Sequence, residues 1–287
     1  MRILHQDEFP PQLLEIPQIP DHLYIKGELP SPTDYIYVSV VGSRKHTSYG
    51  KDACEKIIRG LKGYPFVIVS GLALGMDSIA HKTALEVGLP TIAIPGSGLD
   101  DKVLYPSSNH GLADMILKKG GCLLSEFEPD FRATLWSFPK RNRIVAGISR
   151  AVIVIEAPEK SGALITVRMA VDYNRDVFAV PGSIFSETSK GTNKFIKLGA
   201  TPLTCAEDIL NAFGLIDPLM PTQQTFKEFE DASEDEKKLL SLLGEPLSRD
   251  ELISLSQMSP PSANAIISLL EIKGLISESL GKIRKIM

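Results

Sequence analysis

Cationic and aromatic side chains are interleaved through residues 131–150, a segment that contains no acidic residue. Phe131, Trp136 (the only tryptophan of the chain) and Phe138 supply flat rings that can stack on nucleobases. Because lysine and arginine neutralise phosphates, the two residue types together predict a site for single-stranded nucleic acid. A packed core with solvated arginines is the alternative, but it does not explain cations clustered without a counter-charge. These cations are Arg132, Lys140, Arg141, Arg143 and Arg150.

A second candidate site lies in the stretch VVGSRKHTSYG, where an apolar run ends at Gly42. Glycine lets the chain turn sharply, so we expect Ser43 and Arg44 to lie at the start of the next helix. Free backbone N–H groups and the positive end of a helix favour an anion at such a position. An ordinary turn with a solvated arginine explains this motif equally well.

Another turn follows the next apolar run, in SGLALGMDSIAH. Gly71 and Gly75 permit a close approach of the backbone, and Asp77 can cap or orient the helix that follows. His81 lies four residues after Asp77, on the same helical face. A histidine in this position more often makes a structural hydrogen bond than acts as a catalytic base.

The stretch EAPEKSGALIT repeats the same design with Lys160, Ser161 and Gly162. If all three turns follow parallel strands, the carboxyl ends of those strands place the turns around one crevice. Open parallel sheets bind their ligands in that crevice, so the convergence is a stronger signal than any one turn.

Six short apolar runs supply the strands that would position these turns, and stretches with helical spacing separate them. Apolar character that is continuous rather than alternating is typical of strands buried on both faces. The pattern over residues 35–216 therefore predicts a doubly wound, mostly parallel α/β sheet. The runs are residues 37–41, 66–70, 91–95, 122–125, 151–156 and 177–180.

The regions on either side of this pattern differ from it in composition. Residues 1–34 are rich in proline and predict an extended lead-in with one short strand, and residues 217–233 read as a linker. Residues 234–287 show three short amphipathic patterns and two alternating runs joined at Leu280–Gly281, which predicts a small winged-helix domain. Ser248 and Glu251 have the spacing of a capping box.

The chain of 287 residues has a formal net charge of −4, from 31 basic and 35 acidic side chains. This balance argues against a protein that coats polyanions with its whole surface, but it permits a local cationic site. Residues 217–287 hold 8 basic and 12 acidic side chains, so the C-terminal domain is expected to contact protein, as an interaction or dimerisation module, rather than duplex DNA.

The sequence also predicts the cellular compartment. Its three cysteines are far apart, and no apolar run reaches the length of a membrane span. The N-terminal stretch MRILHQDEFPPQ contains acidic residues and prolines, unlike a secretory leader. We therefore expect a cytoplasmic protein that does not enter a membrane.

Several catalytic motifs are absent from the sequence. There is no GxxxxGK[ST] phosphate loop, no GxSxG elbow and no HExxH, and PGSGLD lacks the third glycine of a dinucleotide fingerprint. The five histidines are scattered, and no nucleophile has an adjacent base. These absences favour a binding protein rather than an enzyme, with no metal and no cofactor.

The motifs together resemble the DprA/Smf family of DNA-processing proteins, over about residues 30–214. The matching blocks, in order, are VVGSR, SGLALGMDSIAH, PGSGLD with YPSSN, LLSE, FPKRNRIVAGIS, VIEA with SGALIT, and VFAVPG with SKGTNKFIKLGA. The resemblance implies a Rossmann-like domain that binds single-stranded DNA, protects incoming strands in natural transformation and loads the RecA recombinase. It also implies a homodimer and no cofactor chemistry.

Carried over position by position, the resemblance assigns a role to each motif. Arg44 would contact phosphate beside Ser43, Gly71 and Gly75 would offer backbone amides, and Phe138 would stack on a base. Some relatives have a lysine just before the Phe138 position, where this chain has Leu135 and Trp136, so Arg132 or Lys140 would supply that phosphate contact. The residues implied to line the floor and a phosphate nest are Arg141, Asn142, Arg143, Lys160, Ser161 and Gly162.

The stretch CAEDILNAFG places Ile209, Leu210 and Phe213 on a short apolar face. The resemblance implies that this neighbourhood serves dimerisation, near the surface that contacts RecA. The same apolar face could equally pack against the sheet of its own domain.

A nucleotide-binding or phosphoribohydrolase-type enzyme of the same superfamily is the alternative function. Those enzymes carry a PGGxGTxxE signature with a catalytic glutamate, and the nearest string here, PGSGLD, has neither the threonine nor the acid. A RecA-binding scaffold with incidental DNA affinity is a third possibility.

Overall fold

The computed structural model describes residues 1–216, 233–279 and 281–285. The chain divides into two compact units, Met1–Ile216 and Asp217–Met287, which we call the N-terminal and C-terminal domains. The division falls where the strand pattern of the sequence ends. The predicted linker lies, apart from Ser233, outside the described residues.

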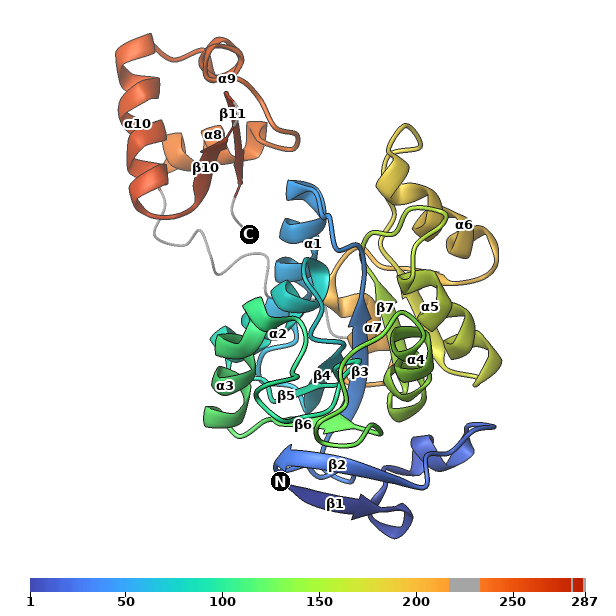
Figure 1. Cartoon of the computed structure of the whole chain (residues 1–287). Helices are drawn as coiled ribbons and strands as arrows, with labels where there is room; N and C mark the ends of the chain where they lie inside the picture. The colour runs from blue at the N-terminus through green and yellow to red at the C-terminus, as the bar shows by residue number, and fades with distance from the viewer. Residues whose placement is uncertain (217–232, 280, 286–287) are drawn as a thin grey trace. The chain divides into compact units, whose positions relative to one another are not determined.

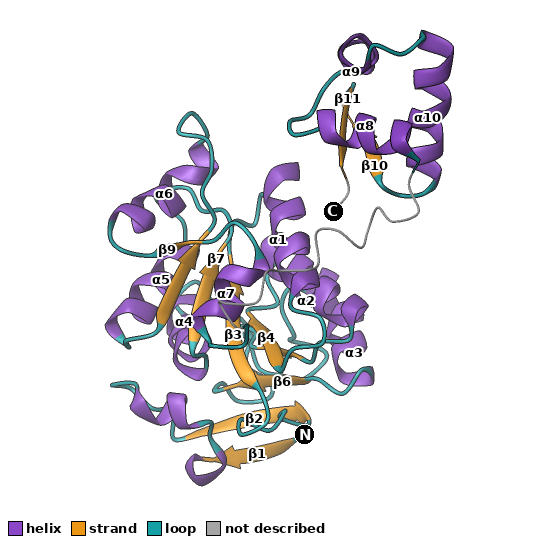
Figure 2. Cartoon of the chain, turned by 180° about the vertical axis from the view of Figure 1, so that it is seen from behind, coloured by secondary structure: helices purple, strands orange, loops and turns teal. Residues whose placement is uncertain are grey.

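A nine-stranded sheet forms the centre of the N-terminal domain (Figures 1 and 2). Its strand order is β1-β2-β6-β5-β4-β3-β7-β8-β9. All six apolar runs form strands, and these six pair in parallel, so the predicted fold class is confirmed. They are β3 (Ile36–Val41), β4 (Phe66–Ser70), β5 (Thr91–Ala93), β6 (Cys122–Ser125), β7 (Ala151–Val154) and β8 (Asp176–Ala179).

Residues 1–34 are part of the sheet rather than an extended lead-in, although the one short strand predicted there is present. They form two strands, β1 (Arg2–His5) and β2 (His22–Gly27), and β2 pairs antiparallel with β6. Leu4, Leu13 and Leu23 are buried in the core of the domain, which explains why the segment folds onto it. The short strand β9 (Thr201–Pro202) extends the opposite edge.

Helices cover both faces of the sheet (Figure 2). Successive side chains of a strand point to opposite faces: Val38 and Val40 of β3 pack with α1 and α2, while Tyr37 and Val41 share a cluster with α4 and α5. Burial on both faces explains why the strands read as continuous apolar runs. The helices are α1 (Ser48–Gly60), α2 (Met76–Val87), α3 (His110–Lys118), α4 (Ser137–Ile148), α5 (Ala163–Asp172), α6 (Lys190–Lys197) and α7 (Ala206–Ala212).

The winding of the chain reverses at β3 and β7, which are neighbours in the sheet. From β3 the chain passes through β4 and β5 to β6 on one side, and it then returns to β7 and continues on the other side. The loops that follow β3 and β7 therefore diverge and leave a crevice at the carboxyl ends of the two strands.

The described residues of the C-terminal domain form three helices followed by a β-hairpin, as the sequence predicts. Ser248 and Glu251 form the predicted capping box, in which the amide of Ser248 donates to the Glu251 carboxylate at 2.8 Å. Leu280, at the expected turn of the hairpin, lies outside the described residues. The elements are α8 (Glu234–Leu242), α9 (Arg249–Ser256), α10 (Pro260–Ile272), β10 (Ile276–Ser279) and β11 (Lys282–Lys285).

The described ranges contain neither a membrane-spanning helix nor a candidate metal-binding cluster. None of the helices in them is both long enough and apolar enough to cross a membrane. Within the same ranges, His, Cys, Asp and Glu side chains form no group of three or more that could hold a metal ion.

His81 makes a structural hydrogen bond inside the domain. Its Nδ1 lies 2.7 Å from the hydroxyl of Thr91, which itself donates to the carbonyl of Ile68 at 2.7 Å. The hydroxyl must therefore accept from His81, so the proton is on Nδ1, and Nε2 is buried without a partner. Burial, reinforced by the charge of Arg141, lowers the pKa of His81 to about 3.

A neutral His81 makes the stability of the fold depend on pH. The unfolded chain protonates this side chain below its ordinary pKa of 6.5, whereas the folded chain does so only near 3, so stability is lost as the pH falls through this window. We expect the wild-type protein to lose about 2 kcal/mol more than a His81→Gln variant between about pH 7 and about pH 5. Urea unfolding of both proteins at the two pH values measures this difference, and equal losses would contradict the assignment.

Candidate functional site

A cavity of about 570 Å³ opens at the carboxyl ends of the central strands, where the winding of the sheet reverses. The turns after β3, β4 and β7 and the first turns of α4 and α5 line it. The structure thus brings together the three turns that the sequence predicted to converge. The sequence-predicted residues in the lining are Ser43, Arg44, Gly71, Phe138, Arg141, Asn142, Ser161 and Gly162.

The turn after β3 is fixed by internal hydrogen bonds. The amide of Ser43 donates to the carbonyl of Glu156 at 2.7 Å, and the amide of Lys45 donates to the hydroxyl of Ser43 at 3.0 Å. Helix α1 begins only at Ser48, so the expectation that Ser43 and Arg44 stand at a helix start is wrong. This turn therefore offers the Arg44 side chain to an anion rather than the end of a helix.

Arg44 and Phe138 are in contact on one wall of the cavity. The guanidinium carbon of Arg44 lies 5.2 Å from the centroid of the Phe138 ring, within the range of a cation–π contact. Phe138 also packs against Tyr105, with ring centroids 5.5 Å apart, and against Gly96, where an added Cβ would lie 2.6 Å from the ring. An exposed cation and a partly buried ring therefore lie side by side.

Arg141 forms part of the cavity floor but is buried and already bonded. Its guanidinium donates to the carbonyls of Gly71 (2.6 Å) and Ile94, and Gly71 leaves room for it, because an added Cβ would lie 2.6 Å from Nη1. Burial lowers the pKa of Arg141 to about 10, opposed by the negative charge of Asp77. Arg141 stays cationic at neutral pH and gives the floor a fixed positive charge.

Asp77 balances that charge and organises the turn after β4. Its carboxylate accepts the amides of Gly71 (3.0 Å) and Ala73 (3.2 Å), while burial raises its pKa against the opposing effect of Arg141. The Gly71 amide is therefore not available to a phosphate, contrary to the expectation. Gly75 lies outside the cavity lining. Only glycine suits this position, because its φ is +78° and an added Cβ would lie 2.5 Å from the carbonyl of Arg44.

The turn after β7 forms the opposite wall. Ser161 accepts the amide of Ala163 at 3.2 Å, and α5 begins at Ala163 directly after Gly162, as the sequence suggested. Asn142 of α4 donates to the carbonyl of Gly162 at 3.5 Å, so the two helices meet at this wall. Lys160, which directly precedes Ser161 in the sequence, is exposed and lies outside the cavity lining.

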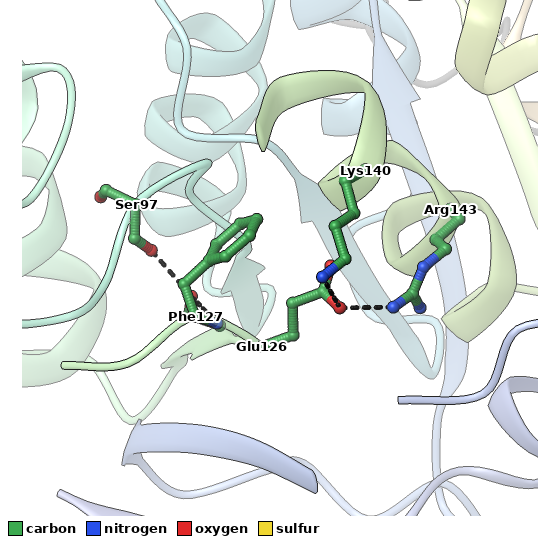
Figure 3. Close-up of polar contacts among 6 residues, drawn as sticks. Ser97, Glu126, Phe127, Lys140 and Arg143 are labelled. Atoms are coloured by element: carbon green, nitrogen blue, oxygen red, sulfur yellow. Dashed lines mark hydrogen bonds and ion pairs between the residues drawn. The ribbon is translucent and has the colours of Figure 1, made fainter. Parts of the chain in front are cut away.

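Two of the predicted cations point to a carboxylate instead of the cavity. Figure 3 shows Glu126 between Lys140 and Arg143; its Oε2 lies 3.5 Å from the ammonium of Lys140 and also contacts the Arg143 guanidinium. Glu126 and Arg143 are each only 7 % exposed at the side chain. The view that this segment lacks a counter-charge is therefore wrong, because Glu126 precedes it in sequence and returns to it through the loop between β6 and α4.

The remaining aromatic residues of the segment support this loop. Phe127 stacks on Phe131 with centroids 4.6 Å apart, and Trp136 packs edge-on against both rings. The ammonium of Lys140 lies 5.4 Å and 5.8 Å from the Phe127 and Trp136 centroids. Arg132 is exposed on the same loop, outside the cavity lining.

The apolar face of α7 packs into its own domain. Ile209 is 0 % exposed and Leu210 is 2 % exposed, both in the cluster that includes α1 and α2. Their predicted role in a dimer interface is therefore wrong, because a side chain without surface cannot contact a second copy. Phe213 is partly exposed and contacts both the Phe66 ring, at a centroid distance of 5.8 Å, and the Arg150 guanidinium.

The sequence analysis missed several polar residues at the cavity and one buried carboxylate that supports its loops. Lys45 and Thr188 line the cavity, as does Asp77, which had been expected only to orient a helix. The buried carboxylate of Glu156 accepts from Thr47 (2.9 and 2.6 Å) and from Thr188 (3.0 Å), so it joins the loops on both sides. An acidic residue directly after a buried strand was the available signal for Glu156.

Comparisons with known proteins agree with this architecture. A family model described as DNA recombination-mediator protein A matches residues 1–214, and one described as the DprA winged helix domain matches residues 227–282. Protein Smf of Escherichia coli is 41 % identical over 209 residues, which is 72 % of this chain and 55 % of that protein. DNA processing protein DprA of Streptococcus pneumoniae is 44 % identical over 207 residues, 72 % of either chain. The chain thus spans only about half the length of the first of these relatives.

Solved structures of DprA proteins are also similar to this chain. DprA from Streptococcus pneumoniae superposes with a TM-score of 0.68 at 41 % identity and covers 73 % of each chain. DprA from Helicobacter pylori has a TM-score of 0.66 at 31 % identity, covering 74 % of this chain and 96 % of the other. The family model matches more than two thirds of the residues of this chain. The chain is therefore a member of the DNA recombination-mediator protein A family, which includes DprA and Smf.

Proposed function

We propose that this protein binds single-stranded DNA in the cavity at the carboxyl ends of the central strands. Arg44 contacts a phosphate and the neighbouring Phe138 stacks on a base. The observation that carries the proposal is the pairing of an exposed guanidinium with an aromatic ring, 5.2 Å apart, on one cavity wall. The Helicobacter pylori relative, described by its single-stranded DNA binding mode, supports the same assignment.

The cavity suits unpaired rather than paired strands. A volume of about 570 Å³ accommodates a base that has left its stack, whereas the bases of a duplex are stacked on one another and are not available to Phe138. Because the whole chain has a net charge of −4, attraction to DNA must come from a few local cations. Arg44 and Lys45 supply this charge at the cavity, because Asp77 balances the buried Arg141, and Arg132 and Lys160 are peripheral phosphate contacts.

Family membership extends the proposal to a biological role. The protein protects incoming strands and loads RecA onto them during natural transformation, as a homodimer in the cytoplasm. It acts by binding, without catalysis and without a cofactor. The winged-helix domain contacts protein rather than duplex DNA, a role supported by the absence of any lysine or arginine between Ser259 and Ile272, the stretch that forms α10.

A mobility-shift comparison tests the central proposal. We expect the protein to retard an oligothymidylate at concentrations that leave a duplex of the same length free. Equal retardation of both would contradict it, and release of adenine from AMP would instead support the phosphoribohydrolase alternative.

Replacing Arg44 tests which cation contacts phosphate. For a single strand, each neutralised phosphate contributes about 0.7 to the slope of log K against log salt. We expect Arg44→Ala to weaken oligothymidylate binding and to flatten the slope by about that amount. Lys140→Ala is the matched control: its ammonium lies against Glu126, so it should change the slope less. Titrations of labelled oligothymidylate at several salt concentrations measure both, and identical slopes for the two variants would refute the assignment.

Replacing Phe138 tests stacking separately from charge. Base stacking on an aromatic side chain contributes about 1–3 kcal/mol, so Phe138→Ala should weaken binding by that amount with little change in the salt slope. Phe138→Tyr keeps the ring and should retain most of the affinity. A loss of slope in Phe138→Ala, measured in the same titrations, would show that the ring acts through Arg44 instead.

A further inference from the structure

The loop between β8 and α6 exposes two large apolar side chains at its tip. Ile184 is 78 % exposed and Phe185 is 91 % exposed. Figure 1 shows this loop, in yellow, projecting beyond the carboxyl ends of the parallel strands, the edge of the sheet where the cavity opens. Two adjacent apolar side chains at such a tip leave a contact surface for a partner.

The base of this loop is held firmly in place. The hydroxyl of Tyr49 donates to the carbonyl of Pro181 at 2.6 Å, and the side chain of Asn193 bonds to both the amide (3.2 Å) and the carbonyl (2.9 Å) of Gly182. At the tip, the amide of Phe185 donates to the hydroxyl of Ser183 at 3.2 Å. The exposed ring is therefore presented on a braced turn, which reduces the entropy lost when a partner binds.

The loop continues directly into the cavity wall. Thr188, three residues after Phe185, lines the cavity together with Pro158. The amide of Ala157 donates to the carbonyl of Thr188 at 2.8 Å, and the hydroxyl of Thr188 bonds to the buried Glu156. A polymer that leaves the cavity on this side passes the loop.

The charges around this path favour a polyanion. Four lysines lie on the cavity rim and the adjoining loops, against two exposed glutamates. Lys45 and Lys160 form no ion pair within the described part of the chain, so they are available to phosphate. The paired lysines are Lys190, with Glu187, and Lys194, with Glu159.

The opposite side of the cavity is a poorer exit. Trp136 is exposed there, but Glu128 and Asp130 are exposed on the preceding loop and repel phosphate. Lys140 is shared with Glu126, so Arg132 is the cation on that loop that stands against these two acidic residues. The balance of charge therefore favours the side of the cavity on which Phe185 lies.

We propose that Phe185 is a second base platform, on which a nucleotide outside the cavity stacks after the strand passes Lys45 and Lys160, with Ile184 packing beside the base. The inference rests on the proposed binding of single-stranded DNA and adds a subsite to it. Substitutions in this loop must therefore change the affinity for a strand that extends beyond the cavity, but not the affinity for one that fills only the cavity.

Phe185→Ala separates the two subsites. An oligothymidylate of about 4 residues fills the cavity alone, whereas one of about 12 residues also reaches the loop. We expect the variant to bind the longer strand about 5- to 150-fold more weakly, the range for one stacked base, and to bind the shorter strand as the wild type does. Phe185→Tyr keeps the ring and should retain the affinity, and the salt slope should not change. An equal effect on both lengths, or no effect on either, would overturn the proposal.

A single-tryptophan protein provides a direct readout. In the double variant Trp136→Phe with Phe185→Trp, the longer oligothymidylate should quench the emission of the only tryptophan, and the shorter one should not. Unchanged emission at saturation with the longer strand would exclude stacking at this position. A change of mass by light scattering in Phe185→Ala would assign the loop to a protein contact instead.

Arg44→Ala distinguishes failure of this proposal from failure of the proposed function. If the cavity binds DNA, Arg44→Ala weakens both the short and the long oligothymidylate. If Arg44→Ala changes neither, the function itself is wrong. If Arg44→Ala weakens both but Phe185→Ala weakens neither, only the second platform is wrong.

Discussion

One buried carboxylate joins two of the loops that border the cavity. Glu156, directly after β7, is 2 % exposed and accepts hydrogen bonds from Thr47 at the start of α1 and from Thr188 before α6. Its backbone carbonyl also holds the amide of Ser43. Burying a charge is costly unless hydrogen bonds replace the lost water, and here the loops before α1 and α6 supply them. Gly50 completes the arrangement, because any Cβ there would lie 2.1 Å from the Glu156 carboxylate.

The cations near the cavity have three different roles, although they are alike in sequence. Arg44 is exposed and lies against an aromatic ring, so its charge is available to a ligand. Arg141 donates to two backbone carbonyls and supports the floor. Arg143 is buried against Glu126, where it holds the loop after β6. Because a buried cation requires a partner within the protein, burial separates structural arginines from those that can contact DNA.

The sequence predicted the parts of this architecture that local pattern determines. Continuous apolar runs identified the six parallel strands, and glycine turns such as Gly42–Arg44 identified the cavity walls. The strand β1 was missed because it is short and only one of its residues is buried, and prolines separate it from β2, the one short strand that was predicted there. Glu126 and the burial of Ile209 depend on how distant segments pack, and an apolar helical face reads the same whether it meets its own sheet or another molecule.

The reversal of winding at β3 and β7 also affects how the protein becomes active during synthesis. Ser43 and Arg44 emerge from the ribosome early, but the wall formed by Ser161 and Gly162 is translated much later. A nascent chain that has completed β3 to β6 holds only one side of the cavity, so a ligand that contacts both walls can bind only after the second wall has formed. A ligand that contacts both walls stabilises the finished domain over its partly folded states.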